Sequence, residues 1–232
     1  HDSSGIRFVR LPGGSFEMGS PESEAGRFTD EGPVHTVSLS PFLIAKYETT
    51  QAEYAAVMAG HATLSATPSQ NVGSAPLSDQ RPVETVSWDD LNLTDGFLER
   101  TGLVLPSEAQ WEYACRAGTV TAYSFGDSIT SSQANINADK TTAVDTFLAN
   151  AWGFHDMHGN VYEWCSDWHG DYPSGSVSNP VGPSVATYRV DRGGGWGNLG
   201  RHLRSANRSR FTPDTRYISL GFRLSLQTEK TE

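Results

Sequence analysis

The sequence predicts an α+β fold built from short elements with much irregular structure. Helix-start signals occur at three places, and short apolar strand candidates are spread along the rest of the chain. Two long connections, 119–150 and 170–183, are rich in Gly, Pro, Ser, Thr and Asn, the residues of turns and loops. No internal repeat, charge block or low-complexity linker divides the 232 residues. We therefore expect one domain over residues 1–232.

Each predicted helix begins at a polar N-cap residue. Thr50 and Ser107 are each followed three residues later by Glu or Gln, which is the spacing of a capping box. Ser87 has a similar polar start, and the apolar residues after it predict a helix that continues as far as Leu98. The helix that starts at Ser107 should end at Gly118, because glycine readily adopts the left-handed conformation that closes a helix.

Runs of apolar and β-branched residues, bounded by turn residues, predict the strands. The strand candidates are 6–11, 35–39, 42–47, 161–165, 188–192 and 221–226. A chain of this length buries roughly 70–75% of the surface that its unfolded form exposes, so a substantial core can form without metals or disulfides.

The charge of the chain is unevenly distributed. The net charge is −10, which argues against general nucleic-acid binding, so we expect no nucleic-acid partner. Seven arginines nevertheless lie between Arg192 and Arg223, with Asp214 as the single acid among them. Such a cluster either forms an anion-binding patch or ties loops to carboxylates elsewhere in the fold. The second interpretation concerns Arg201, Arg204, Arg208, Arg210, Arg216 and Arg223.

Only two cysteines, Cys115 and Cys165, are present. Two are too few for a disulfide scaffold or a four-cysteine zinc site, and they are either buried thiols or one disulfide. No apolar run is long enough to cross a bilayer, so this domain is not expected to insert into a membrane. The first residues lack the pattern of a signal peptide. A cell-surface or secreted location is favoured over a cytoplasmic one, although the sequence names no compartment.

The segment 192–222 alternates a rigid-looking frame with residues that follow neither the period of a strand nor that of a helix. Every one of these irregular residues has a codon that differs from AAC or AAT only in its first two letters. Lys, Gln, Glu and Met cannot be reached in this way, and none of them occurs between Gly197 and Leu220. The segment therefore resembles the variable region of a diversity-generating retroelement protein, at about 196–220.

On this interpretation the variable residues form a ligand-binding surface. The physical logic is that of antibody loops, in which rigid elements hold adaptable side chains. The frame comprises Gly193, Gly194, Trp196, Arg204, Ser205, Ala206, Asn207, Arg208, Pro213, Asp214, Gly221 and Phe222. The candidate ligand-binding residues are Gly197, Asn198, Leu199, His202, Ser209, Phe211, Thr215, Tyr217, Ile218 and Ser219.

Several longer blocks of the sequence occur in a recognisable order. They are GGSFEMGS at 13–20, PFLIAKYETTQAEY at 41–54, PVETVSWDDL at 82–91, LPSEAQWEYACRAG at 105–118, NAWGFHDMHGNVYEWCSDW at 150–168 and RVDRGGGW at 189–196. Together they resemble the formylglycine-generating enzyme family, also called sulfatase-modifying factors. The resemblance covers nearly the whole chain and implies a C-type-lectin-like α+β fold with much irregular structure.

The resemblance also implies which catalytic residues to look for, and they are absent. Enzymes of the family oxidise a client cysteine with copper(I), which they bind through two cysteines after an RGGS motif. Here Gly195 stands where the serine is usual, and no cysteine follows Cys165. A related branch holds iron with clustered histidines, but His155 and His158 are expected to be ordinary solvated or hydrogen-bonded loop residues. We therefore expect no catalytic residue and no required cofactor.

A structural calcium ion is the one metal that the resemblance implies. Family members hold it in the segment that matches Asp156, Gly159, Val161 and Glu163. The two acids supply hard anionic oxygens, and the other two residues would supply carbonyls. A second family site would use Asn135 and its neighbour's carbonyl, but the loop that follows is shortened.

The sequence thus predicts a non-catalytic protein that binds a ligand through diversified residues on a C-type-lectin-like scaffold. The expected partner is a variable protein or another macromolecule. A divergent or degenerate enzyme of the same family is the main alternative. A regulatory or structural module that kept only the fold is the third interpretation, and neither alternative explains the codon pattern.

Overall fold

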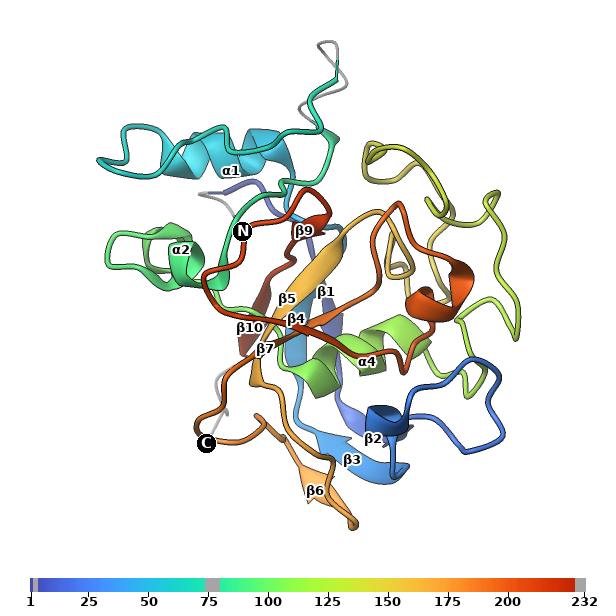
Figure 1. Ribbon diagram of the computed structural model, residues 1–232. Coiled ribbons are helices and arrows are strands. Elements are labelled where there is room, and N and C mark those ends of the chain that lie inside the picture. The colour runs from blue at the N-terminus through green and yellow to red at the C-terminus, as the bar shows by residue number, and fades with distance from the viewer. Residues whose placement is uncertain (2–3, 74–79, 228–232) are drawn as a thin grey trace.

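The computed structural model describes residues 1, 4–73 and 80–227, and it shows the predicted α+β mixture of short helices and short strands (Figure 1). Four α-helices and two short 3-10 helices lie among the described residues. They are α1 (Gln51–Met58), α2 (Trp88–Asn92), α3 (Phe97–Thr101), α4 (Glu108–Arg116), η1 (Thr29–Glu31) and η3 (Gly200–Leu203). None of these helices is long and apolar enough to cross a membrane.

The strands form three small sheets. The first has the order β1-β4-β10, from β1 (Phe8–Leu11), β4 (Phe42–Ala45) and β10 (Ser225–Gln227). The second has the order β2-β3-β6, from β2 (Gly14–Met18), β3 (His35–Leu39) and β6 (Val177–Ser178). The third has the order β8-β7-β5-β9, from β8 (Ser209–Phe211), β7 (Arg189–Arg192), β5 (Tyr162–Trp168) and β9 (Leu220–Gly221).

The predicted helix starts are confirmed, but the second helix is shorter than expected. Thr50, Ser87 and Ser107 each cap a helix, and each forms a capping box with the residue three positions later. The expected continuation from Ser87 to Leu98 is wrong, because the chain divides into α2 and α3. Asp95 has a φ of 62° between them, and a residue in the left-handed region cannot continue a right-handed helix.

The predicted strands are present with changed boundaries. The strand at 35–39 is confirmed residue for residue, whereas the last candidate, 221–226, is divided between β9 and β10. Phe222 and Arg223 lie between these two strands and are both fully buried. Strands β2, β6 and β8 were not predicted, because they are short and carry Gly, Ser or Arg where an apolar run is the usual signal.

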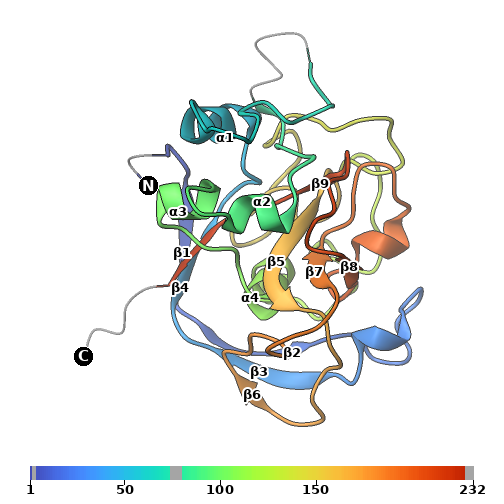
Figure 2. The same ribbon diagram turned by 60° about the vertical axis from the view of Figure 1, so that its left-hand side comes forward.

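Helix α4 lies at the centre of the molecule, in contact with β2, β3, β5 and β7 (Figure 2). All nine of its residues are buried, including Glu108, Glu112 and Arg116. Trp111, Ala114 and Cys115 belong to one hydrophobic cluster, and a second cluster around Tyr54, Phe97 and Phe222 packs under α1, α2 and α3. A buried helix with three charged residues needs partners for them, and the C-terminal part of the chain supplies arginine partners for Glu108 and Glu112.

The C-terminal segment begins and ends in one sheet. Strand β7 leads into residues 193–208, β8 then pairs antiparallel with β7, and β9 pairs parallel with β5. In Figure 1 this segment runs from orange to red across one side of the molecule, with η3 well separated from the 212–217 loop. The predicted variable region is therefore anchored by sheet pairing near its middle and at its end.

Candidate ligand-binding surface

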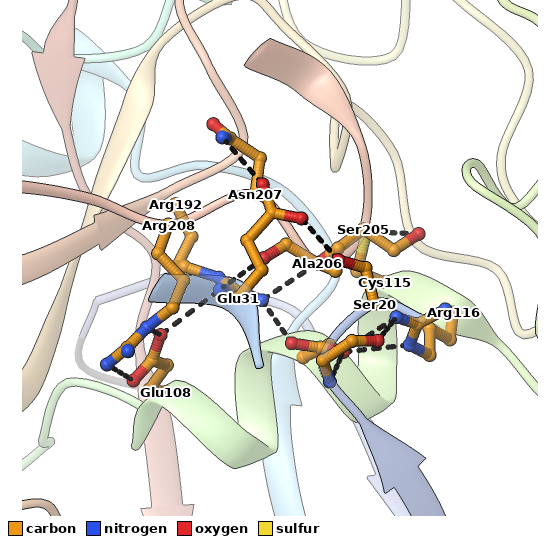
Figure 3. A network of polar contacts seen from close by, with 12 residues as sticks. Ser20, Glu31, Glu108, Cys115, Arg116, Arg192, Ser205, Ala206, Asn207 and Arg208 are labelled. Carbon is orange, nitrogen blue, oxygen red and sulfur yellow. Dashed lines mark hydrogen bonds and ion pairs between the residues drawn. The ribbon is translucent and has the colours of Figure 1, made fainter. Parts of the chain in front are cut away.

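Most of the predicted frame is buried and tied to α4, although Trp196 and Pro213 are half-buried and Asp214 is exposed. Arg192 donates through Nη1 to Glu108 Oε1 at 3.1 Å and through Nη2 to the carbonyl of Ser205 at 2.7 Å. Its Nη2 also contacts Glu112, one turn further along the helix. Arg208 donates to both carboxylate oxygens of Glu108, at 2.6 and 2.9 Å. Figure 3 shows Arg192 and Arg208 converging on α4, so one helix holds the chain just before the frame and again at Arg208.

A second set of contacts ties the frame to η1. Arg204 donates to both oxygens of Glu31, at 2.7 and 2.5 Å, and to Glu24 at 2.6 Å. Ser20 and Asn207 donate to the same Glu31 carboxylate, at 2.7 and 3.3 Å. Glu31 is 0% exposed, so this carboxylate depends on protein donors in place of water.

The pKa values of these acids show that their partners outweigh burial. Burial raises the pKa of Glu31, but hydrogen bonds from Arg204 and Ser20 bring it below its ordinary value. Burial also raises the pKa of Glu108, and the charges of Arg208 and Arg192 bring it below its ordinary value. Both carboxyls are therefore ionised at neutral pH, and charge-assisted hydrogen bonds hold the frame in place.

The arginine cluster mainly ties loops to carboxylates, as one of the two interpretations of the sequence predicted. Five of the six arginines concerned make ion pairs, whereas for Arg201 the described residues supply no carboxylate and its Nε contacts the ring of His202 at 3.1 Å. The five pairs are Arg204–Glu31, Arg208–Glu108, Arg210–Asp30, Arg216–Asp90 and Arg223–Glu163. Positive charge that is already paired does not form a general anion-binding patch.

The candidate ligand-binding residues lie mostly outside this frame, toward solvent. Leu199 is 60% exposed and Tyr217 is 51% exposed, and Gly197 is exposed as well. Frame residues are different, since Arg204 is only 1% exposed and Arg208 only 6%. The remaining candidates are half-buried, with one exception that is described below: Asn198, His202, Ser209, Phe211, Thr215 and Ile218.

Contacts bring one group of these candidates together at the start of β5. The rings of Phe211 and Tyr217 lie 6.2 Å apart. Burial raises the pKa of the Tyr162 phenol, and Asn198 and Tyr217 lie close enough to influence it as well. The indole of the half-buried Trp196 donates to the carbonyl of Ile218 at 3.3 Å, which links the two halves of the variable segment. Tyr162 was missed in the sequence because it lies outside the segment with the codon pattern.

His202 lies in a second group, at η3. Its ring stacks on Phe28 at a centroid distance of 5.6 Å, and the Arg201 guanidinium lies 5.9 Å from the same phenyl ring. Phe28 is 37% exposed and precedes η1, the element that Arg204 anchors. Residues outside the variable segment therefore contribute to both ends of the candidate surface.

The expectation that Ser219 faces solvent is wrong. Ser219 is 6% exposed, and its carbonyl accepts a hydrogen bond from the Tyr162 amide at 2.7 Å. A Cβ added to Gly195 would come within 2.8 Å of the Ser219 Cβ, so the two residues are packed against each other. The residue turns inward because β9 starts to pair with β5 at the next position.

A buried acid lies beneath the same surface. Asp191 is 0% exposed, and it pairs with Ser209 across β7 and β8. Neither of its carboxylate oxygens has a hydrogen-bond partner among the described residues. Burial raises the pKa of Asp191 to about 8, and the Ser209 hydroxyl moderates this rise without meeting the geometry of a hydrogen bond. Asp191 thus differs from the acids of the frame, which have guanidinium partners.

The two cysteines are buried and free, so the disulfide alternative is not realised. Cys115 Sγ lies 3.7 Å from Nε2 of His158, a contact that the sequence did not reveal. Burial raises the pKa of Cys115 to about 12 and lowers that of His158 to about 4, so both groups are neutral. The thiolate is the reactive and metal-binding form, and neither cysteine provides it here.

Both histidines of the H-x-x-H pair are hydrogen-bonded, which agrees with the expectation that they are ordinary hydrogen-bonded loop residues. His158 Nδ1 donates to the carbonyl of Leu203 at 2.7 Å, and its Nε2 accepts from the Ser124 amide at 3.1 Å. His155 Nδ1 donates to the carbonyl of Phe147 at 2.9 Å. No three His, Cys, Asp or Glu side chains within residues 1, 4–73 and 80–227 are grouped so that they could hold a metal ion.

The two acids among the predicted calcium ligands, Asp156 and Glu163, are both buried. Glu163 is fully buried and accepts from Nε and Nη2 of Arg223, both at 2.6 Å, and from the indole of Trp111. Asp156 accepts from the backbone amide of Asp145 at 3.2 Å, and burial raises its pKa to about 7. A calcium ion would have to share the Glu163 carboxylate with Arg223. Calcium binding through Asp156, Gly159, Val161 and Glu163 stays a prediction.

A family match covers almost the whole chain. The family described as "Sulfatase-modifying factor enzyme 1-like domain" matches residues 2–228. The chain is 32% identical over 285 residues to the formylglycine-generating enzyme of Streptomyces coelicolor, covering 96% of this chain and 90% of that enzyme. It is 34% identical over 237 residues to serine/threonine-protein kinase pkn1 of Chlamydia caviae, covering 93% of this chain. It spans only 37% of the length of that relative.

Among solved structures, Treponema denticola variable protein 1 has the same fold. It superposes with a TM-score of 0.81 at 25% identity, and the match covers 96% of this chain and 95% of that one. These findings confirm the resemblance that the sequence motifs indicated. The fold is the predicted C-type-lectin-like α+β fold of the formylglycine-generating-enzyme type, with much irregular structure.

Proposed function

The chain belongs to the family of sulfatase-modifying factor enzyme 1-like domains, and we propose that this member is a non-catalytic ligand-binding protein. It displays diversified residues on a C-type-lectin-like scaffold, and its partner is a protein or another macromolecule. The contact surface is supplied by Gly197, Asn198, Leu199, His202, Ser209, Phe211, Thr215, Tyr217 and Ile218. Ser219 is left out of this set because it is buried.

The contrast between frame and variable positions is the observation that carries this proposal. Variable positions such as Leu199 and Tyr217 are more than half exposed, whereas the frame arginines Arg204 and Arg208 are buried and paired. A surface that tolerates many sequences needs this separation, because side chains that hold the fold cannot also be free to change. The likeness to a variable protein over 96% of the chain supports the same interpretation.

The arrangement of aromatic and polar side chains suits a large partner. Stable protein interfaces bury about 800 Å² on each partner, with aromatic anchors near the centre. Phe211 and Tyr217 lie in contact with each other, with Ile218 and Asn198 linked to the same region. Asn198, Ser209 and Thr215 add adaptable hydrogen-bonding groups, as the polar residues of antibody loops do.

The alternative, a divergent or degenerate enzyme of the same family, has less support from the site. No cysteine follows Cys165 in the sequence, so the segment after the RGG motif contains no thiol. Cys115 is buried with a pKa of about 12, which keeps its thiol protonated. We expect no conversion of a sulfatase-motif peptide cysteine to formylglycine with copper and oxygen, and mass spectrometry of the peptide distinguishes the two functions.

Two displayed libraries test the binding function directly. The first randomises Leu199, His202, Phe211, Thr215 and Tyr217, and the second randomises the five frame positions 204–208. Both are selected against lysozyme as an arbitrary globular target. We expect folded binders from the first library and mostly unfolded proteins from the second. In a selected complex that retains an aromatic residue at 217, its replacement by Ala should cost about 2 kcal/mol of binding free energy.

The outcome contradicts the proposal if the first library yields no binders, or if both libraries yield folded binders equally often. The neighbouring DNA gives an independent check. A near-identical repeat with adenines at the variable codons, beside a reverse-transcriptase gene, is expected if the segment is diversified by a retroelement.

A further inference from the structure

A cavity of about 390 Å³ lies between the hairpin of β2 and β3 and the C-terminal end of α4. None of the candidate ligand-binding residues lines it. The volume is within the range of about 300–1,000 Å³ that small-molecule sites occupy. The function proposed above does not use this cavity, and the residues that line it determine which ligand it can bind.

Three aromatic rings form one side of the cavity. Tyr113 is the central ring, 9% exposed, and its hydroxyl donates to the carbonyl of Gly13 at 2.8 Å. The ring of Phe16 lies 5.3 Å from that of Tyr113, at an angle of 56°. The ring of Trp152 lies 4.8 Å from the ring of Tyr113, at an angle of 61°. Phe16 and Trp152 are only half-buried, so both contribute accessible ring surface to the cavity.

Charge around the cavity excludes an anionic ligand. Arg116 is the one basic residue in the lining, and it is buried. Its guanidinium already donates to Glu112 at 2.9 Å, to the carbonyl of Gly19 at 2.8 Å and to the carbonyl of Thr121 at 3.3 Å. A guanidinium with these partners has little donor capacity left for a phosphate or carboxylate.

Negative potential is instead available from three sources. Glu17 lines the cavity, is exposed, and accepts a hydrogen bond from Thr36 Oγ1 at 2.7 Å, the contact that orients its carboxylate. The lining also includes the C-terminal turn of α4, where the aligned peptide dipoles leave partial negative charge. The faces of aromatic rings carry negative charge as well, and they attract cations that shed water easily.

We propose that this cavity binds a small organic cation that carries a quaternary ammonium group. The methyl groups of such a cation pack against the rings of Phe16, Tyr113 and Trp152, and Glu17 supplies the one carboxylate among the residues that line the cavity. A quaternary ammonium is weakly hydrated and makes no hydrogen bonds, which matches an aromatic wall beside one exposed carboxylate, with the Arg116 guanidinium buried and already paired. The site is separate from the variable surface, so either can bind when the other does not.

Calorimetric titration with choline chloride at constant ionic strength tests the proposal. The matched probe is the neutral carbon isostere of choline, in which a tert-butyl group replaces trimethylammonium. The two have the same shape, so a difference between them reports charge alone. We expect choline to bind about tenfold or more tightly than the isostere, the ratio that cation–π and carboxylate attraction together produce.

Variants assign the binding to named residues. Trp152→Leu should weaken choline binding by about tenfold, and Glu17→Gln by about fivefold. Glu22→Gln, which neutralises an exposed acid outside the cavity, and Tyr217→Ala, which alters the variable surface, should leave it unchanged. Melting curves of all variants check that the fold is retained, and Glu17→Gln keeps the test valid if Trp152→Leu does not fold.

Four results would overturn the proposal, three of which concern choline itself. These three are equal affinity for choline and its isostere, no binding of choline at millimolar concentration, and choline binding that Glu17→Gln leaves unchanged. Tighter binding of glucose than of choline would also overturn it, because a sugar uses aromatic faces without needing the charge.

Discussion

The buried frame and the variable positions occupy the same short segment, yet they use their side chains in opposite ways. Arg204 and Arg208 point inward to Glu31 and Glu108, while Leu199 before them and Tyr217 after them are more than half exposed. Two arginines are therefore inside and two large apolar or aromatic side chains outside, the reverse of the usual distribution. This reversal allows the surface chemistry to change without altering the contacts that hold the segment.

A second contrast concerns the buried acids themselves. Glu31 and Glu108 have guanidinium partners and pKa values below the ordinary ones, whereas Asp191 has none and a pKa of about 8. The acids with partners stabilise the frame in their ionised form. Asp191, opposite Ser209 on the strand next to β8, costs stability when it is ionised.

The largest expected effect comes from breaking the frame. Arg204→Ala leaves Glu31 buried with its charge uncompensated, so we expect a loss of roughly 3–5 kcal/mol in the free energy of unfolding. Arg210→Ala is the matched control, because this arginine has a 47% exposed side chain and pairs with a half-buried Asp30. It should cost about 1 kcal/mol or less. Urea denaturation of the two variants measures the difference, and equal losses would remove the distinction between frame and surface.

The same pair has a pH signature. The pKa of Glu31 is below its ordinary value of 4.5, so its stabilising contribution is present above that value and is lost as the pH falls through the lowered pKa. Arg204→Ala should reduce the stability that is lost when Glu31 is protonated at low pH. Arg210→Ala should leave this loss unchanged.

Calcium tests whether a cation can help to neutralise the buried carboxyls of Asp156 and Glu163. If it binds there, a hundredfold excess over the dissociation constant should stabilise the fold by about 2.7 kcal/mol. The measurement is the melting temperature in millimolar calcium and in chelator, with Asp156→Asn as the variant that should abolish the shift. Identical melting curves for the unaltered protein in both conditions would count against the site.

Asp191→Asn sharpens the contrast between paired and unpaired acids. The pKa of Asp191 is raised from an ordinary 3.8 to about 8, so the folded protein loses stability as the pH rises from the first value to the second. Asn cannot ionise, so the variant avoids this loss. The difference in the free energy of unfolding between the variant and the unaltered protein should therefore grow with pH. We expect a gain of about 1–3 kcal/mol near pH 8 and almost none near pH 4. Denaturation curves at the two pH values check this, and a gap independent of pH would contradict it.

The smallest effects are expected at the variable positions. His202→Ala and Thr215→Ala should change the free energy of unfolding by no more than about 0.5 kcal/mol, because both residues lie on the half-exposed surface. Ser219→Ala should lower the free energy of unfolding by more than these two substitutions, because Ser219 is buried. Phe222→Ala, in the core, serves as the contrast and should cost roughly 3–5 kcal/mol. Thermal and urea unfolding of the four variants give the ranking.

The sequence by itself determined the features that depend on short spacings. A capping box needs residues only three positions apart, so Thr50, Ser87 and Ser107 could be recognised as helix starts without knowledge of the fold. The family blocks and the codon pattern are local as well, and they led to the fold class and to the division into frame and variable positions. The break at Asp95 was missed because the apolar pattern continues across it.

Only the tertiary structure decided which groups meet across long separations. Arg204 pairs with Glu31, 173 residues away in the sequence, and no local pattern selects that acid from the others. The burial of Ser219, the contact between Cys115 and His158, and the orphan carboxylate of Asp191 likewise depend on how strands and loops pack. Local spacing governs hydrogen bonds within one turn of chain, whereas burial and charge pairing are properties of the whole folded core, where distant segments replace water as partners.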